Sequence, residues 1–223
     1  MSVGCSHRTP NPQGAHWYTV PVPSLATSKP TSLRSETSPP KGVNALHPTL
    51  VPVRTRSATT LDAPLVHELY AATPAYFEII SIPVPTLQEV ATDIATAIQD
   101  PRRFVEIVLL EGPDHESIGA AAGCPLDPIT GQPVAGYLDY KLDYPQAGDA
   151  TVNLLLIRHG LQSFGVGTAC AEDLERRLAG RAQRMLASIY GDNPRARTFW
   201  ERLGYKFAID AKPLLEWYAK QID

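Results

Sequence analysis

The stretch from Leu154 to Gly167 constrains this chain more than any other. It begins with four consecutive branched apolar residues, which are typical of a buried strand, and it ends in a polar turn with two glycines one residue apart. The pattern predicts a strand that leads through a loop into a helix. Glycine lets the backbone approach a ligand closely, and the first amides of a helix point outward at the positive end of its dipole. The stretch therefore predicts a phosphate-binding loop with the spacing Gln-x-x-Gly-x-Gly over residues 162–167.

A second motif follows further along the chain. Its members are Asn193, Ala196, Phe199, Trp200, Leu203, Gly204 and Tyr205. Together, in this order and spacing, the two motifs resemble those of the GNAT superfamily of N-acetyltransferases, which carry Gln/Arg-x-x-Gly-x-Gly/Ala directly after the fourth strand. The resemblance covers residues 51–210 and is strongest over residues 133–205. It implies an α/β (α+β) fold whose central sheet is mixed, largely antiparallel and six- or seven-stranded, flanked by about four helices and splayed between the fourth and fifth strands.

The composition changes near residue 50. Residues 1–50 hold eight of the 21 prolines and carry a formal charge of +3, so the chain total of −3 leaves −6 on residues 51–223. The first segment cannot bury enough apolar surface to offset its ordering entropy. We therefore expect a disordered Pro/Ser/Thr-rich tail over residues 1–50 and one GNAT N-acetyltransferase domain over residues 51–223. A docking arm, an unstructured extension and a start codon assigned too far upstream are alternative interpretations of the tail.

Charge, cysteines and hydropathy exclude several classes of protein. A mildly acidic domain lacks the basic surface that binds nucleic acid. Three scattered cysteines are typical of reduced thiols. No apolar run reaches the roughly 18 residues of a membrane helix, and the N-terminus has no apolar signal-peptide core. The sequence therefore predicts a cytoplasmic protein that binds neither nucleic acid nor membrane, and it leaves a homodimer open.

Hydrophobic periodicity predicts the elements of the domain. Strands are expected over Val51–Arg56, Phe104–Glu111, Pro133–Tyr144, Ala150–Ile157, Ala182–Tyr190 and Tyr205–Ile209, with a part of a strand in Ser117–Cys124. Helices are expected from a cap at Thr60 or Asp62 to Ala72, in a short piece through Ile80, and over Leu87–Ile98, Thr168–Leu178 and Pro194–Leu203. Leu214–Ile222 fits either a last strand or an end helix, and the resemblance favours the strand.

The resemblance also implies which residues hold acetyl-CoA, the acyl donor. Its pantetheine arm is expected along the exposed backbone of Leu155, Leu156 and Ile157, in the gap between the splayed strands. Its pyrophosphate is expected among the amides of Gln162, Ser163, Phe164, Gly165, Val166, Gly167 and Thr168. Asn193 is expected to contact the arm near the sulfur, and the alternative is a plain turn residue. The family prefers glycine where Ser163 stands, so we expect a slightly altered loop that still binds.

The candidate catalytic residues depart from the family pattern. Trp200 stands where many relatives have a tyrosine proposed to protonate the leaving thiolate, and an indole has no proton to give. A thiol has a pKa near 8.5, so the thiolate leaves without much help, and Tyr190 or a water could serve as the acid. An amine with a pKa near 10 needs a base, for which we select Asp139 over Asp143. Asn153 lies where relatives often have a glutamate, and its amide can bind but cannot abstract a proton.

These observations predict an acetyl-CoA-dependent N-acetyltransferase. It would move the acetyl group to a primary amine of a small-molecule or peptide acceptor by direct attack in a ternary complex. The alternatives are a non-catalytic acyl-CoA-binding module and a structural or partner-binding domain. His67, His115 and His159 have no partners at metal or triad spacing, so no metal is expected. The pair Arg195 and Arg197 is expected on a solvated helix face.

Overall fold

The computed structural model describes residues 51–208 and 216–222. The predicted tail over residues 1–50 lies outside the described residues, as do the predicted strand positions Ile209, Leu214 and Leu215. The domain boundary near residue 50 and the disorder of the tail therefore stay predictions.

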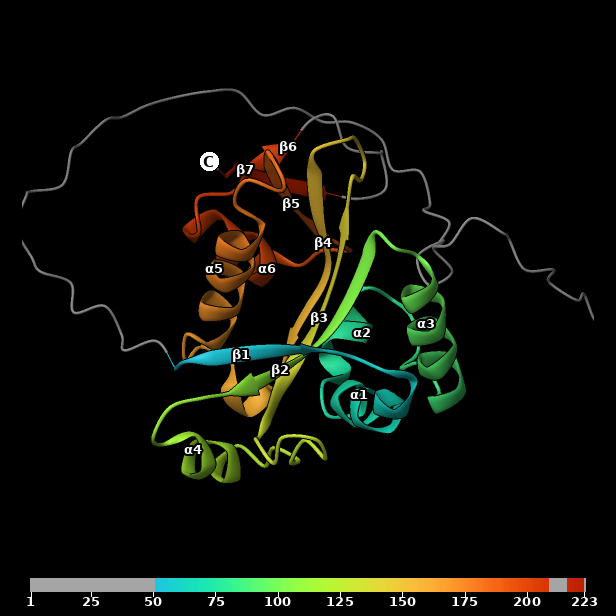
Figure 1. Ribbon diagram of the computed structural model, residues 1–223, viewed down its shortest axis with the longest axis vertical. Helices are drawn as coiled ribbons and strands as arrows, with labels where there is room; N and C mark the ends of the chain where they lie inside the picture. Colours follow the sequence, from blue (N-terminus) through green and yellow to red (C-terminus); the bar gives the residue numbers. More distant parts are fainter. Residues whose placement is uncertain (1–50, 209–215, 223) are drawn as a thin grey trace, which may run out of the picture. The chain divides into compact units, whose positions relative to one another are not determined.

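Seven strands of the described residues form one sheet (Figure 1). They are β1 (Val53–Ser57), β2 (Arg103–Leu110), β3 (Val134–Leu142), β4 (Asp149–Ile157), β5 (Arg184–Ile189), β6 (Lys206–Ala208) and β7 (Glu216–Gln221). The order across the sheet is β1-β2-β3-β4-β5-β7-β6, and each neighbouring pair is antiparallel except β4 and β5. The predicted mixed, largely antiparallel sheet is confirmed. The predicted last strand is confirmed as β7.

Six α-helices of the described residues lie around this sheet, two more than the four expected. They are α1 (Ala63–Ala71), α2 (Pro74–Ile79), α3 (Leu87–Gln99), α4 (His115–Ala121), α5 (Val166–Leu178) and α6 (Pro194–Arg202). Thr86 and Glu89 form a reciprocal cap at the start of α3: the Thr86 hydroxyl accepts from the Glu89 amide at 3.3 Å, and Glu89 Oε2 accepts from the Thr86 amide at 2.8 Å. Proline occupies the first turn of α1, α2 and α6, where its missing amide hydrogen costs nothing.

The prediction for Ser117–Cys124 is wrong, because we expected this segment to form part of a strand. Residues 115–121 form the helix α4 instead. This segment is rich in alanine, the strongest helix former, and it lacks the β-branched residues that favour strands, apart from Ile118. The helix ends before Gly123, whose φ of +64° is the left-handed conformation usual after a helix.

Helices cover both faces of the sheet (Figure 1). On one face, α5 buries Cys170 and Leu174 in a cluster with Val108 of β2. On the other face lie α1, α2 and α3, where the ring of Tyr70 in α1 meets the ring of Tyr137 in β3 at a centroid distance of 6.2 Å. Neighbouring residues of a strand point to opposite faces, so each buried strand serves both layers of core.

The sheet opens between β4 and β5. These strands pair only from residue 149 to residue 152 of β4, so the remainder of β4 pairs with β3 alone. The opening coincides with an irregularity, since Leu154 lies opposite Asp139 while Val152 lies opposite Tyr140. Asn153 is therefore an extra residue, which makes a β-bulge and locally increases the twist of β4. The predicted splay between the fourth and fifth strands is confirmed, and its start is marked by the bulge.

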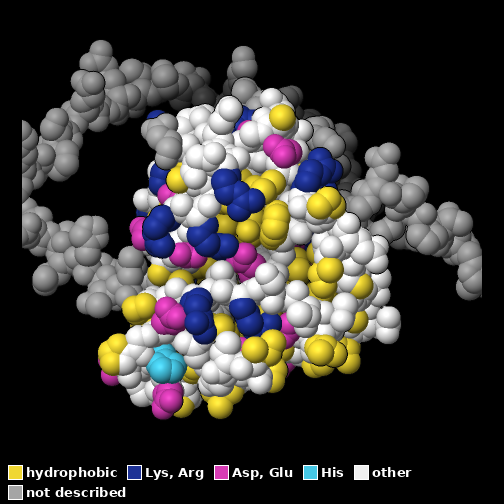
Figure 2. Space-filling model, viewed as in Figure 1, with side chains coloured by type: hydrophobic (Ala, Val, Ile, Leu, Met, Phe, Trp, Pro, Cys, Tyr) yellow, Lys and Arg dark blue, Asp and Glu magenta, His cyan; other side chains and the backbone are white. Residues whose placement is uncertain are grey.

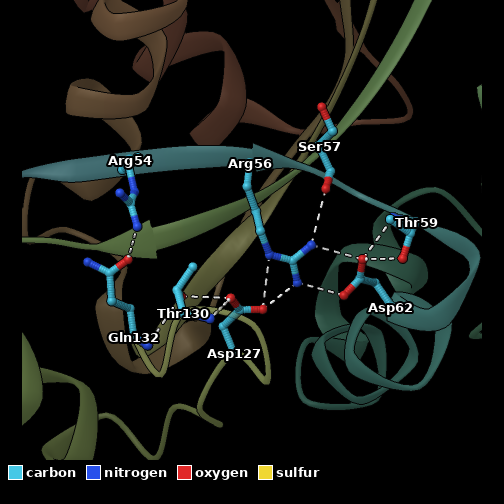
Figure 3. A network of polar contacts seen from close by, with 8 residues as sticks. All are labelled: Arg54, Arg56, Ser57, Thr59, Asp62, Asp127, Thr130 and Gln132. Carbon is cyan, nitrogen blue, oxygen red and sulfur yellow. Dashed lines mark hydrogen bonds and ion pairs between the residues drawn. The ribbon is translucent and has the colours of Figure 1, made fainter.

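A network around Arg56 fastens the edge strand β1 (Figure 3). The guanidinium lies between two buried carboxylates, Asp62 before α1 and Asp127 in the loop before β3. Thr59 and Thr130 donate further hydrogen bonds to these carboxylates. Burial alone would raise the pKa of both carboxyl groups, but the hydrogen bonds from Arg56 and the threonines lower it. The network ties three segments that are distant in the sequence.

Charged side chains of both signs are interspersed over the face shown in Figure 2. Ion pairs form both between elements and within one helix: Arg177 of α5 contacts Glu106 of β2 at 2.8 Å and Asp173 of the same helix at 2.9 Å. Every described helix lies in residues 51–208. None of these helices is both long and apolar enough to cross a membrane.

Candidate active site

The glycine loop connects β4 to α5 as the sequence predicted. A short 3-10 turn (His159–Leu161) follows the strand, and α5 begins at Val166 with Gly165 at its N-cap. Gly165 has a φ of +80°, and Ser163 has a φ of +69°. The positive φ at Ser163 explains why a glycine is favoured at this position, because serine adopts the left-handed conformation only with strain.

The start of α5 suits an anion. Its first turn contains no acidic side chain, so the positive end of the helix dipole has no negative partner within that turn. The backbone amide of Gln162 donates to the carbonyl oxygen of His159 at 3.1 Å and is thus engaged within the protein. The amides of residues 163–168 are the part of the predicted cradle that remains for a ligand.

The free edge of β4 leads directly into this loop. Leu155, Leu156 and Ile157 contribute their side chains to the core, as expected, since Leu156 and Ile157 are buried and Leu155 packs against the cluster of α5. Their backbone pairs with β3 on one side only. The structure thus places the strand edge and the loop amides consecutively along one path.

The side chain of Gln162 connects the two sequence motifs. Its Nε2 donates to the carbonyl oxygen of Ile157 at 2.9 Å, and its Oε1 accepts from Nη2 of Arg195 at 3.3 Å. A second contact joins the motifs at Gly167, where an added Cβ would lie 3.4 Å from the ring of Phe199. The glycine loop and the first turn of α5 therefore lie beside α6.

The second motif has two structural roles. Asn193 caps α6, since its Oδ1 accepts from the amide of Ala196 at 3.0 Å, and the side-chain nitrogen takes no part in that cap. Trp200 is buried, with its ring centroid 4.9 Å from that of Phe199 and 4.8 Å from that of Tyr205. Trp200 therefore belongs to the core.

Asp139 lies in a buried polar cluster beside the bulge. Arg103 of β2 donates to both of its oxygens, with Nη2 at 2.6 Å from Oδ2, and it also pairs with Asp93 of α3 at 2.9 Å. Asn153 donates from Nδ2 to Oδ1 of Asp139 at 3.0 Å. Burial raises the pKa of the Asp139 carboxyl above its usual value, although Arg103 and Asn153 act in the opposite direction.

Tyr190 lies where β5 ends, on the open side of the splay. Burial raises the pKa of its hydroxyl, and the nearby Tyr76, Tyr144 and Asp139 raise it further. Tyr76 comes from α2 and is partly exposed, whereas Phe77 of the same helix and Ile80 just after it are buried in the core. The loop after Tyr190 approaches α2 closely, because a Cβ at Gly191 would overlap the backbone oxygen of Ile79.

Three contacts at this site escaped the sequence analysis. Arg103 holds Asp139, Asp93 pairs with the same Arg103, and Arg195 reaches the glycine loop. One sequence feature could have indicated the role of Arg103: it is an arginine at the start of an apolar strand, and an arginine buried there needs a charged or polar partner. Tyr137 has a buried hydroxyl with no hydrogen-bond partner in residues 51–208 or 216–222. Within these same ranges no cluster of His, Cys, Asp and Glu could hold a metal ion.

Comparisons with known proteins agree with this geometry. The sequence model of the acetyltransferase (GNAT) family matches residues 89–205. No curated protein matches the sequence. Among solved structures, an acetyltransferase from Thermus thermophilus is 34% identical, covers 77% of this chain and 98% of its own, and superposes with a TM-score of 0.64.

Two more distant structures share the fold. An acetyl transferase from Salmonella typhimurium that modifies the N-terminal serine of 50S ribosomal subunit protein L7/L12 is 15% identical, with 77% of this chain and 96% of that chain covered and a TM-score of 0.58. A spermidine N-acetyltransferase from Vibrio cholerae, solved with CoA and spermine, is 10% identical, with 76% and 95% covered and a TM-score of 0.57.

Proposed function

The chain belongs to the GNAT family of acetyltransferases, and from this premise we propose that it acetylates a primary amine with acetyl-CoA by direct attack in a ternary complex. The observation that carries the proposal is the free edge of β4 that continues into the glycine loop. Unpaired strand backbone can hydrogen-bond to an amide-bearing ligand arm, and the loop amides can bind phosphate. One elongated ligand with both groups, as CoA has, fits this path.

The acceptor would bind between α2 and the end of β5. Tyr76, Tyr144 and Asp139 each come within electrostatic reach of Tyr190 there. The relatives described above act on a protein N-terminus and on a polyamine, and both of these acceptors carry primary amines. We extend this acceptor class, a small-molecule or peptide amine, to the present chain.

The chemistry requires two proton transfers. The amine nitrogen forms a bond with the acetyl carbonyl carbon as the carbon–sulfur bond breaks, so one proton must leave the nitrogen and one must reach the sulfur. Acetyl-CoA supplies the thioester, and we assign the base to Asp139, whose raised pKa suits proton abstraction. We assign the proton donor to Tyr190, because its raised pKa keeps the hydroxyl protonated. Backbone amides near Leu155 or Leu156 would stabilise the negative charge on the carbonyl oxygen.

A specific observation favours a second candidate, a non-catalytic acyl-CoA-binding module. Both oxygens of Asp139 are already hydrogen-bonded, and the family's usual acid is replaced by the buried Trp200. In this case the CoA path would be retained without proton transfer at the sulfur. Both candidates predict that the protein binds acyl-CoA, and only the transferase predicts turnover.

Two measurements test the proposal. Calorimetry with acetyl-CoA measures binding, and thiol release measured with spermine, spermidine, free amino acids and peptides with N-terminal serine or internal lysine measures turnover. We expect amine-dependent thiol release, a product heavier by one acetyl group, and initial-rate lines that intersect when both substrates are varied. Binding without thiol release would favour the non-catalytic module, parallel lines would replace the ternary complex by a covalent enzyme intermediate, and absence of binding would contradict both candidates.

A further inference from the structure

Arg195 reaches over the glycine loop from a different helix. It occupies the second position of α6, and its Nη2 donates to Oε1 of Gln162 at 3.3 Å. Gln162 is fixed in turn by its bond to the carbonyl oxygen of Ile157 at 2.9 Å. The guanidinium is thereby held at the first residue of the predicted phosphate-binding loop.

The charge of Arg195 is not neutralised by a neighbour. Its side chain is exposed, and in residues 51–208 and 216–222 it forms no ion pair with a carboxylate, because its partner Gln162 is a neutral amide. The other arginines near the loop differ in this respect. Arg197 pairs with Asp192 at 3.1 Å, and Arg158 pairs with Glu68 at 3.2 Å. Arg195 therefore retains its positive charge beside a helix N-terminus that also lacks a negative partner.

The position of Arg195 does not benefit its own helix. A cation in the first turn of a helix opposes the helix dipole and typically destabilises the helix by a few tenths of a kcal/mol. The contact with Gln162 uses one of the five N–H donors of the guanidinium, so the others are available to a ligand. A planar fork of donors matches the oxygens of a phosphate group.

We propose that Arg195 binds the pyrophosphate of CoA and supplies the positive charge that the backbone amides of the loop lack. The inference rests on the proposed use of CoA by this chain. Because Gln162 belongs to the loop itself, a pyrophosphate bound by the loop amides would be the phosphate of CoA nearest to the guanidinium, since the 3′-phosphate is attached further along the molecule, on the ribose. Gln162 holds Arg195 in place before the ligand binds, which limits the side-chain entropy lost on binding.

Calorimetry with CoA and with dephospho-CoA, which lacks the 3′-phosphate, tests the assignment. Arg195→Ala should weaken the binding of both ligands by the same factor, about 10- to 100-fold, which is the usual effect of losing a charge-assisted hydrogen bond. Arg195→Lys should recover part of the loss. Arg202→Ala is the matched control, because Arg202 is an exposed arginine in the last turn of the same helix, and it should leave both affinities unchanged.

Each other outcome overturns the assignment. A loss confined to CoA would place Arg195 on the 3′-phosphate, and equal affinities of the wild type and Arg195→Ala for CoA would remove Arg195 from the site. If the wild type itself does not bind CoA, the proposed function fails, and this outcome is recognised without any variant. Thermal unfolding of Arg195→Ala should match that of the wild type, so a loss of affinity cannot be attributed to a loss of fold.

Discussion

Asn153 donates a hydrogen bond from Nδ2 to Oδ1 of Asp139 over 3.0 Å, from the bulge of β4 to the middle of β3. The bond joins the residue at which β4 leaves β5 to the residue we propose as the base. Arg103 and Asp93 complete this cluster, whose formal charge is −1 when both carboxyl groups are ionised. The geometry of the splay and the ionisation of Asp139 are therefore connected.

Asp139→Asn should lower kcat by about 10²- to 10⁴-fold, the usual contribution of a general base. The pKa of Asp139 is raised by burial, and a base must be deprotonated, so the wild-type rate should rise with pH through that pKa and the variant should lose this rise. The affinity for acetyl-CoA should not change. Asp93→Asn is the control, because it removes a carboxylate from the same arginine without altering β3. Equal losses in the two variants would show that Asp139 only maintains the cluster.

Local patterns in the sequence predicted the elements that we propose to bind the donor. The apolar run before Gln162, the glycines of the loop, and Asn193 and Gly204 at the ends of α6 each act through neighbouring residues, so their spacing suffices. The amphipathic repeats of α3 and α5 are equally local. For this reason the fold class and the path of the loop could be predicted with small errors at the element ends.

The contacts that hold Asp139 and the side chain of Gln162 are not local. Arg103 meets Asp139 across 36 positions of sequence, and the bulge at Asn153 is visible only in the register of β3 against β4. Arg195 meets Gln162 across 33 positions. A pattern of apolar and polar residues states which face of an element is buried, but it does not state which distant charge lies opposite. The prediction of a strand at Ser117–Cys124 was wrong for a different reason. Alanine and glycine give only a weak hydrophobic pattern, whether the segment forms a helix or a strand.

Ser163→Gly should stabilise the protein by about 1 kcal/mol, the difference between the strain removed and the entropy added. Serine at a φ of +69° is strained by roughly 1–3 kcal/mol, and glycine removes this strain while it adds about 0.5–1 kcal/mol of unfolded-state entropy. The affinity for CoA should be unchanged, because the backbone amide remains. Ser163→Val, with a β-branched side chain at the same φ, should lower the stability. Urea unfolding and calorimetry measure both effects, and a less stable glycine variant would contradict the interpretation of Ser163.

Arg56→Met should lower the free energy of unfolding at pH 7 by about 3–5 kcal/mol, because it leaves the buried carboxylates of Asp62 and Asp127 unpaired. The folded pKa values of these carboxyl groups lie below the usual value. In the wild type their stabilising effect is thus present above about pH 4 and lost as the pH falls through the folded pKa values.

The variant should show the opposite dependence on pH in the acid range. Without Arg56, burial raises the pKa of the two carboxyl groups, so protonation favours the folded variant. The difference in the free energy of unfolding between the variant and the wild type therefore becomes smaller as the pH falls. Urea unfolding between pH 3 and pH 7 measures this change. Arg54→Met is the matched control on the same strand, since its pair with Glu111 is exposed and should contribute less than about 1 kcal/mol. A constant difference at all pH values would exclude ionised Asp62 and Asp127 as the partners of Arg56.

Tyr190→Phe should lower kcat by about 10- to 100-fold while the KM for acetyl-CoA stays the same, because the variant loses only the hydroxyl that we propose as the proton donor to sulfur. The raised pKa of Tyr190 predicts that the wild-type rate does not fall from its ionisation between pH 7 and pH 10. Tyr140→Phe is the control on the opposite face of the sheet, where the hydroxyl contacts Glu106 at 3.3 Å, and it should affect stability without affecting kcat. An acyl donor with a more acidic thiol provides a further test. Its thiolate needs less protonation, so the difference in kcat between Tyr190→Phe and the wild type should be smaller with this donor. If both donors show the same difference, the hydroxyl of Tyr190 acts by positioning the acceptor and not by assisting the sulfur.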